Sequence, residues 1–110
     1  MRIGYFDCFS GVSGDMILGA LVDAGVKVGE MQAAISGLGV SGIHLDAQRV
    51  KRGAFPGTRV HVRTDEQGQP HRHLPDIEAI LDRADIPVLV RTDAKRIFRR
   101  LAEAEATAHG

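Results

Sequence analysis

Residues 2–24 read RIGYFDCFSGVSGDMILGALVDA, and this stretch decides which fold the chain can adopt. Arg2–Phe9 carries apolar side chains at odd and even positions alike, which is typical of a strand covered on both faces. After a turn rich in glycine and serine, Met16–Ala24 is apolar nearly all round and predicts a buried helix. Ser13 is the expected N-cap, and Asp15 falls in the first turn, where a negative charge complements the helix dipole.

Outward from this stretch, the pattern predicts another helix and a β-hairpin. Apolar residues recur at helical spacing over Val28–Leu38, and Gly37 and Gly39 end the helix. Ile43–Val50 and Thr58–Thr64 alternate apolar and polar residues, as the strands of a hairpin do. A polar loop is expected over residues 65–73.

Two helices close the chain. Pro75 and Pro87 stand where the first turn of a helix tolerates proline. The final helix carries an apolar stripe formed by Val90, Ala94, Ile97, Leu101 and Ala104. The predicted order is therefore β-α-α-β-β-α-α over residues 1–110. It describes a single α+β domain with a short mixed sheet, the first strand at its centre, covered by helices.

Composition and charge exclude several classes of protein. The chain has 110 residues, 44% of them hydrophobic, which suits one domain with a buried core. Its 14 Lys and Arg residues balance 14 Asp and Glu residues, and aromatic side chains are only 5%, so no nucleic-acid partner is expected. Cys8 is the single cysteine, which excludes an intramolecular disulfide, and it is expected in the core.

No membrane or targeting segment is expected either. The longest apolar stretch lies within Met16–Val22, far short of the roughly 18–20 residues that span a bilayer. An acidic residue interrupts the N-terminus before the apolar core of a signal peptide could develop. These features predict a cytoplasmic protein.

The first candidate site combines two carboxylates and two hydroxyls, those of Asp7, Ser10, Ser13 and Asp15. Asp7 stands near the C-terminal end of the predicted strand, and the next helix aims free backbone N–H groups at the same place. The turn lacks the lysine of a phosphate-binding loop, and two like charges 4 Å apart repel by about 4 kcal/mol at an effective dielectric of 20. A hard cation or the donors of a polar ligand fit better. The alternative is that Asp15 is only a helix-terminal charge and Asp7 a capping acceptor.

The second candidate site is His71-Arg72-His73. In an extended segment, residues two apart point the same way, so His71 and His73 can share one borderline metal ion such as nickel or zinc. Two ligands do not complete a metal site, and a solvated polar loop is the alternative. The basic strand face of Arg59, His61 and Arg63 could hold an anion, although such faces are usually solvated or paired with nearby acids.

Two long motifs near the ends of the chain match a known family. The first is YFDCFSGVSGDM over Tyr5–Met16, and the second is IFRRLAEAEA over Ile97–Ala106, closed by His109-Gly110. Gly57-Thr58 and the histidine-containing loop continue the match between them. Over essentially its whole length, the chain resembles the N-terminal part of the LarC family of nickel-insertion proteins.

This resemblance implies a metal-insertion enzyme. Family members act as a nickel chelatase of the lyase type. They place nickel into a pyridinium bisthiocarboxylic acid mononucleotide in a CTP-dependent step that matures the lactate racemase cofactor. Nickel would be the substrate ion, the CTP site would lie outside this chain, and the C-terminal domain of the same protein would be the partner. The chain alone is expected to be inactive, and the sequence leaves oligomerisation open.

With this resemblance, the candidate residues of the first site can be given roles as a hypothesis. Asp7 and Asp15 would help position nickel or the pyridinium ring, while Ser10 and Ser13 would donate hydrogen bonds to a substrate carboxyl or phosphate. The alternative from a different functional class is a non-catalytic structural or docking module of the same larger protein.

Overall fold

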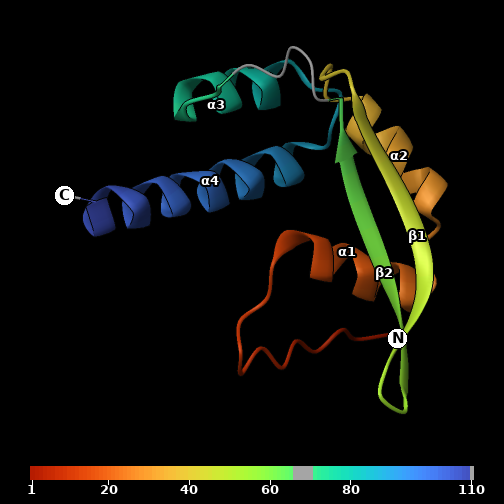
Figure 1. The fold of residues 1–110 in the computed structure, drawn as a ribbon. Helices are drawn as coiled ribbons and strands as arrows, with labels where there is room; N and C mark the ends of the chain where they lie inside the picture. Colours follow the sequence, from red (N-terminus) through yellow and green to blue (C-terminus); the bar gives the residue numbers. More distant parts are fainter. Residues whose placement is uncertain (66–70, 110) are drawn as a thin grey trace.

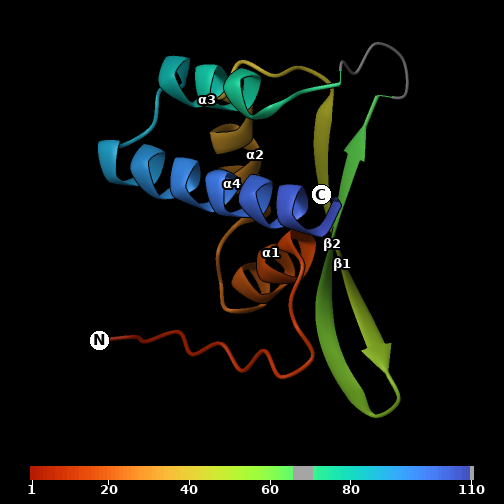
Figure 2. The same cartoon turned by 90° about the vertical axis from the view of Figure 1, so that its left-hand side faces the viewer.

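Along the chain, an antiparallel β-hairpin separates two pairs of helices. The computed structural model describes residues 1–65 and 71–109. Along the chain the elements are α1 (Gly14–Asp23), α2 (Val28–Ser36), β1 (Ile43–Arg52), β2 (Phe55–Thr64), α3 (Leu74–Arg83) and α4 (Val88–His109) (Figure 1). All four helices lie on the same side of the hairpin (Figure 2). The α+β class is confirmed, and so is the order of two helices, a hairpin and two helices.

The hairpin closes through a tight turn. Ile43 pairs with Thr64 at its open end, and Arg52 pairs with Phe55 beside the turn. Gly53 adopts a φ of +61°, a left-handed conformation that favours glycine, and this lets the chain reverse within two residues. Both strands are consequently longer than the alternation alone predicts.

Helix α1 lies directly on the backbone of β2. A Cβ atom at Gly19 would stand 2.6 Å from the carbonyl oxygen of Thr58, so only glycine allows this approach. At the end of α1, the Asp23 carboxylate accepts hydrogen bonds from Arg49 Nη1 at 2.8 Å and from Thr58 Oγ1 at 2.7 Å. Because Arg49 and Thr58 face each other across the hairpin, this carboxylate joins α1 to both strands.

Helix α2 is held along the outer edge of β1 by one amide side chain. Gln32 Nε2 donates to the carbonyl oxygen of Ile43 at 3.0 Å, and Gln32 Oε1 accepts from the N–H of Leu45 at 2.8 Å. The amide thus satisfies backbone groups that a neighbouring strand would otherwise pair. The hairpin contributes Leu45 and Val60 to the buried core.

Helices α3 and α4 form an antiparallel pair held by cations of α4. Lys95 pairs with Asp82 at 2.7 Å and Arg99 with Glu78 at 2.9 Å. These hydrogen bonds are the main reason that the pKa values of both carboxyls lie below their ordinary values. One turn earlier on α4, the Arg91 guanidinium donates at 3.0 Å to the carbonyl oxygens of Leu81 and Ala84 at the C-terminal end of α3, where helix carbonyls lack a full set of intrahelical partners.

The strand predicted over Arg2–Phe9 does not form in the part of the chain that the structure describes. The segment is exposed, with Ile3 at 81% and Tyr5 at 89% of full exposure. A strand with two apolar faces needs neighbouring strands and a layer on each face, and the described residues supply neither beside this segment. Within residues 1–65 and 71–109 the sheet is therefore two-stranded and antiparallel, rather than mixed with the first strand at its centre.

Other apolar residues are also less covered than their pattern predicts. Cys8 is exposed rather than in the core, and Met16 of α1 is largely exposed. On α4 the face toward α3 contains half-buried Phe98, whereas Ile97 of the predicted stripe is 67% exposed. The reason is that α4 has α3 as its main neighbour, so only one side of its apolar surface is covered. Residues 66–70 of the predicted polar loop lie outside the described residues.

No helix in residues 1–65 and 71–109 combines the length and the apolar character needed to cross a bilayer.

The close contact of α1 with β2 predicts a large effect of Gly19→Ala. The added Cβ would meet the Thr58 carbonyl oxygen, so the helix must move, and we expect a loss of about 1–3 kcal/mol in the free energy of unfolding. Urea unfolding followed by circular dichroism measures this. The matched control is Gly29→Ala in α2, where nothing lies within 4 Å and alanine should stabilise by about 0.5–1 kcal/mol. Equal stability of the two variants would contradict the contact.

Candidate functional site

The start of α1 brings two of the predicted site residues together. Ser13 is the N-cap, as predicted, and its hydroxyl donates a short hydrogen bond to the Asp15 carboxylate. This bond is the first cause of a lowered pKa at Asp15, and nearby backbone N–H groups and the Arg59 guanidinium lower it further, while desolvation acts in the opposite direction. Asp15 therefore stays ionised, with a cation from β2 within electrostatic reach.

Asp7 and Ser10 are not joined to this pair. Both are exposed, and among the described contacts neither side chain makes a hydrogen bond. The turn between them is closed by the Gly11 N–H, which donates to the Cys8 carbonyl oxygen at 2.9 Å. Since the strand expected to hold Asp7 does not form here, nothing fixes its carboxylate against the 10–15 turn. A site containing all four residues stays a prediction.

The two histidines of the second candidate site lie side by side. The ring centroids of His71 and His73 are 5.0 Å apart, with the ring planes nearly perpendicular. His73 is the N-cap of α3, and its backbone N–H donates to the Asp76 carboxylate at 2.9 Å, which holds it at the helix start. The two rings lie close together, as expected for residues two apart in an extended segment. No group of three or more metal-ligating side chains forms among the residues that the structure describes.

A cavity of about 420 Å³ opens beside these histidines, between the start of α3 and the C-terminal half of α4. We call it the α3–α4 cavity. Its apolar lining comes from Leu74, Ile77, Phe98, Leu101, Ala102 and Ala106. Its polar lining comes from His71, Arg72, His73 and Glu105.

Glu105 was not among the residues singled out from the sequence, although a signal for it exists. Acids at 78 and 82 and cations at 95 and 99 form pairs only if α3 and α4 are antiparallel in one register. In this register, a residue four positions earlier in α3 lies opposite a residue four positions later in α4. This register places the loop at 71–73 opposite Glu105, and the shared cavity bears it out.

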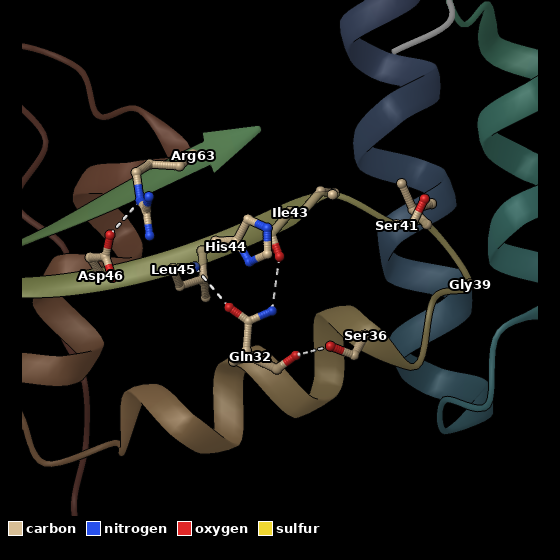
Figure 3. Close-up of a pocket in the computed structure, with 11 residues that line it drawn as sticks. Gln32, Ser36, Gly39, Ser41, Ile43, His44, Leu45, Asp46 and Arg63 are labelled. Carbon is tan, nitrogen blue, oxygen red and sulfur yellow. Dashed lines mark hydrogen bonds and ion pairs between the residues drawn. The ribbon is translucent and has the colours of Figure 1, made fainter. Parts of the chain in front are cut away.

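A larger hollow of about 620 Å³ lies between α2 and β1 (Figure 3). Its polar side chains are already engaged with one another or with the backbone. Arg63 pairs with Asp46 at 2.5 Å, Gln32 binds the backbone of β1, and Ser36 Oγ donates to the Gln32 carbonyl oxygen at 2.9 Å. The Gln32 contact holds α2 on the hairpin, and the other two lie within the hairpin and within α2, so the hollow belongs to the scaffold. They also show that part of the basic strand face is paired with a neighbouring acid.

Comparison with known proteins gives one consistent result. The family model described as "Nickel insertion protein" matches residues 4–110. A putative nickel insertion protein from Roseiflexus castenholzii is 50% identical over 109 residues, which cover 99% of this chain and 27% of the relative. A pyridinium-3,5-bisthiocarboxylic acid mononucleotide nickel insertion protein from Desulfitobacterium hafniense is 46% identical over 110 residues, 100% of this chain and 27% of the relative. The chain thus spans little more than a quarter of the length of these relatives. No solved structure matches.

The hydrogen bond between Ser13 and Asp15 predicts the effect of Ser13→Ala. Without the hydroxyl donor, the pKa of Asp15 should rise toward its ordinary value, because the charged carboxylate loses its main partner. Carbon-13 NMR of the Asp15 carboxyl, titrated from about pH 2 to about pH 6, measures the change. Ser10→Ala is the matched control and should leave the titration unchanged. A shift of the same size in both variants would exclude a specific role of Ser13.

Proposed function

The chain belongs to the nickel insertion protein family, and we propose that it is the N-terminal domain of an enzyme that inserts nickel into pyridinium-3,5-bisthiocarboxylic acid mononucleotide. The observation that carries this proposal is 46% identity, across the whole chain, to a relative named for that substrate. Because the chain spans 27% of that relative, the complete reaction requires the rest of a longer polypeptide. Residues 1–110 alone are then inactive.

Nickel is the substrate ion in this proposal, and His71 and His73 are the side chains that receive it. Their rings lie 5.0 Å apart at the exposed rim of the α3–α4 cavity, where an ion can enter from solvent. Neutral imidazole nitrogen is a favourable ligand for nickel and for neighbouring divalent metals. Two imidazoles leave coordination positions open, as an ion that must be handed on to sulfur ligands requires.

The turn before α1 has a positioning role in the same proposal. Asp15 is ionised and lies at the start of a helix, close enough to Arg59 for the two charges to interact. It can hold a cation, and the Ser13 hydroxyl, which donates to Asp15 in this structure, can bind a substrate carboxyl or phosphate by turning away from Asp15. Asp7 and Ser10 are included on the family resemblance of the motif that contains them.

The remaining features of the proposal rest on the family resemblance alone. We assign the reaction to the CTP-dependent nickel chelatases of the lyase class, with the CTP site in the rest of the longer protein. The product would be the lactate racemase cofactor, and the reaction would take place in the cytoplasm.

A second candidate function is a non-catalytic docking module, and one observation favours it. Large apolar side chains are exposed along the N-terminal segment and on α4, among them Ile3, Tyr5, Phe9, Leu89 and Ile97. Exposed apolar surface of this kind is typical of a surface that packs against another part of the protein. In this case the rest of the longer polypeptide carries the chemistry.

A calorimetric titration of the chain with nickel chloride tests the metal role. His71→Ala and His73→Ala should each weaken nickel binding at least about tenfold, because a chelating pair becomes a single ligand. The matched control is His44→Ala, an exposed histidine of β1, which should bind nickel like the wild type. Asp7→Asn and Asp15→Asn test the acids in the same way. Unchanged affinity in both histidine variants would remove the pair from the metal role.

Nickel insertion by a longer protein that contains this segment tests the enzyme proposal. With nickel, CTP and the pyridinium bisthiocarboxylic acid mononucleotide, mass spectrometry should detect the nickel-containing nucleotide, and omission of CTP should abolish it. A variant altered at Asp7, Asp15, His71 and His73 together should lose most of the product while remaining folded. Full activity of that variant would favour the docking module instead.

A further inference from the structure

The ladder of ion pairs between α3 and α4 stops just before the α3–α4 cavity. Lys95 pairs with Asp82, and Arg99 pairs with Glu78 one turn later. One turn further toward the C-terminus of α4, the residues are Ala102 and Glu105. The opposite residues of α3 are Leu74 and Pro75, at the start of that helix. No cation of α4 forms a further ion pair with α3 there, and the small side chains do not fill the space between the two helices. The result is the cavity of about 420 Å³.

The apolar lining of this cavity suits a planar ring. Leu74 and Ile77 line it from α3, and α4 contributes the aromatic ring of Phe98 with Leu101, Ala102 and Ala106. The volume falls within the roughly 300–1,000 Å³ of small-molecule sites, which are mostly apolar with a few polar groups that set orientation. A Phe side chain favours an aromatic partner in an offset or edge-to-face arrangement.

The polar lining contains the Glu105 carboxylate together with the Arg72 guanidinium, a cation that is itself engaged in an interaction. Glu105 forms no ion pair with any residue that the structure describes. The neighbouring acids differ, since Glu103 lies 3.9 Å from Arg100 and Glu78 pairs with Arg99. A carboxylate beside an apolar wall attracts a ligand that is both aromatic and cationic.

We propose that the α3–α4 cavity binds the pyridinium ring of the nucleotide substrate, with Glu105 facing the positive ring and His71 and His73 presenting nickel at the same rim. The inference rests on the proposed function, which supplies the chemical class of the ligand. In this proposal, Glu105 and the apolar lining of the cavity recognise the ring, and the two imidazoles bind the metal.

The turn before α1 is the competing place for the ring, and its charges are less suitable. The Asp15 carboxylate already accepts the Ser13 hydroxyl and interacts with Arg59. The interaction with Arg59 offsets part of the negative charge of Asp15, which makes this turn less attractive to a cationic ring.

The test uses the 110-residue chain with nicotinic acid mononucleotide, a stable pyridinium nucleotide, as the probe. In two-dimensional NMR, we expect the backbone amides of residues 71–77 and 98–106 to shift on addition of the probe. Ala106→Phe fills the cavity and should weaken binding at least about tenfold. Ala104→Phe, on the same exposed helix but outside the lining, is the matched control and should bind like the wild type.

A second pair of variants tests the charge. Glu105→Gln should weaken binding about two- to fivefold, the size expected for one exposed charge pair, while Glu103→Gln should leave it unchanged. Ribose 5-phosphate, which lacks the ring, should not shift the same amides. Helical circular dichroism should be unchanged in all four variants, because the altered side chains are exposed.

Three results would overturn the inference: no binding of the probe at millimolar concentration, equal binding by Ala106→Phe and Ala104→Phe, or equal shifts with ribose 5-phosphate. Such failure is separable from failure of the proposed function. If the longer protein still inserts nickel and the histidine variants still bind nickel more weakly, only the location of the ring is wrong. If the probe binds as expected but no nickel is inserted, the cavity is a ring site and the proposed enzyme activity is wrong.

Discussion

The contact between Gly19 and the backbone of β2 is the constraint on which the first half of the structure depends. With a Cβ position only 2.6 Å from the Thr58 carbonyl oxygen, α1 can lie on the strand only because that side chain is absent. The helix is then fixed at its other end by Asp23, which binds both strands. As a consequence the start of α1, with Ser13 and Asp15, comes within electrostatic reach of Arg59. A backbone contact thus determines the charge environment of a candidate site residue several residues away.

The second half is organised by charge rather than by close packing. Three cations of α4 engage α3, and the two carboxylates they bind have lowered pKa values because the charged form is hydrogen-bonded. Exposed ion pairs contribute little stability singly, but a row of them in one register specifies how two antiparallel helices align. Where the row ends, the helices are separated by a cavity instead of a packed core. The same register brings the loop with His71 and His73 opposite Glu105.

The uncovered apolar surface relates this chain to its relatives. Arg2–Phe9 has the composition of a central strand, yet its side chains are exposed, and Ile97 on α4 is exposed as well. The relatives are between three and four times as long as this chain. An apolar segment that the described residues leave uncovered can be buried by further polypeptide, which would also supply the partner strands that Arg2–Phe9 requires.

The amino-acid sequence by itself determined the features that depend on near neighbours in the chain. Ser13 as an N-cap, the proline at the start of α3, the hairpin and the adjacency of two histidines two residues apart all follow from local geometry. Only the tertiary structure decided which apolar faces are covered, that Asp15 lies near Arg59, and that Glu105 shares a cavity with the histidines. The physical reason is that periodicity shows where a buried face lies on an element, whereas burial and charge pairing depend on which distant element comes to lie against it.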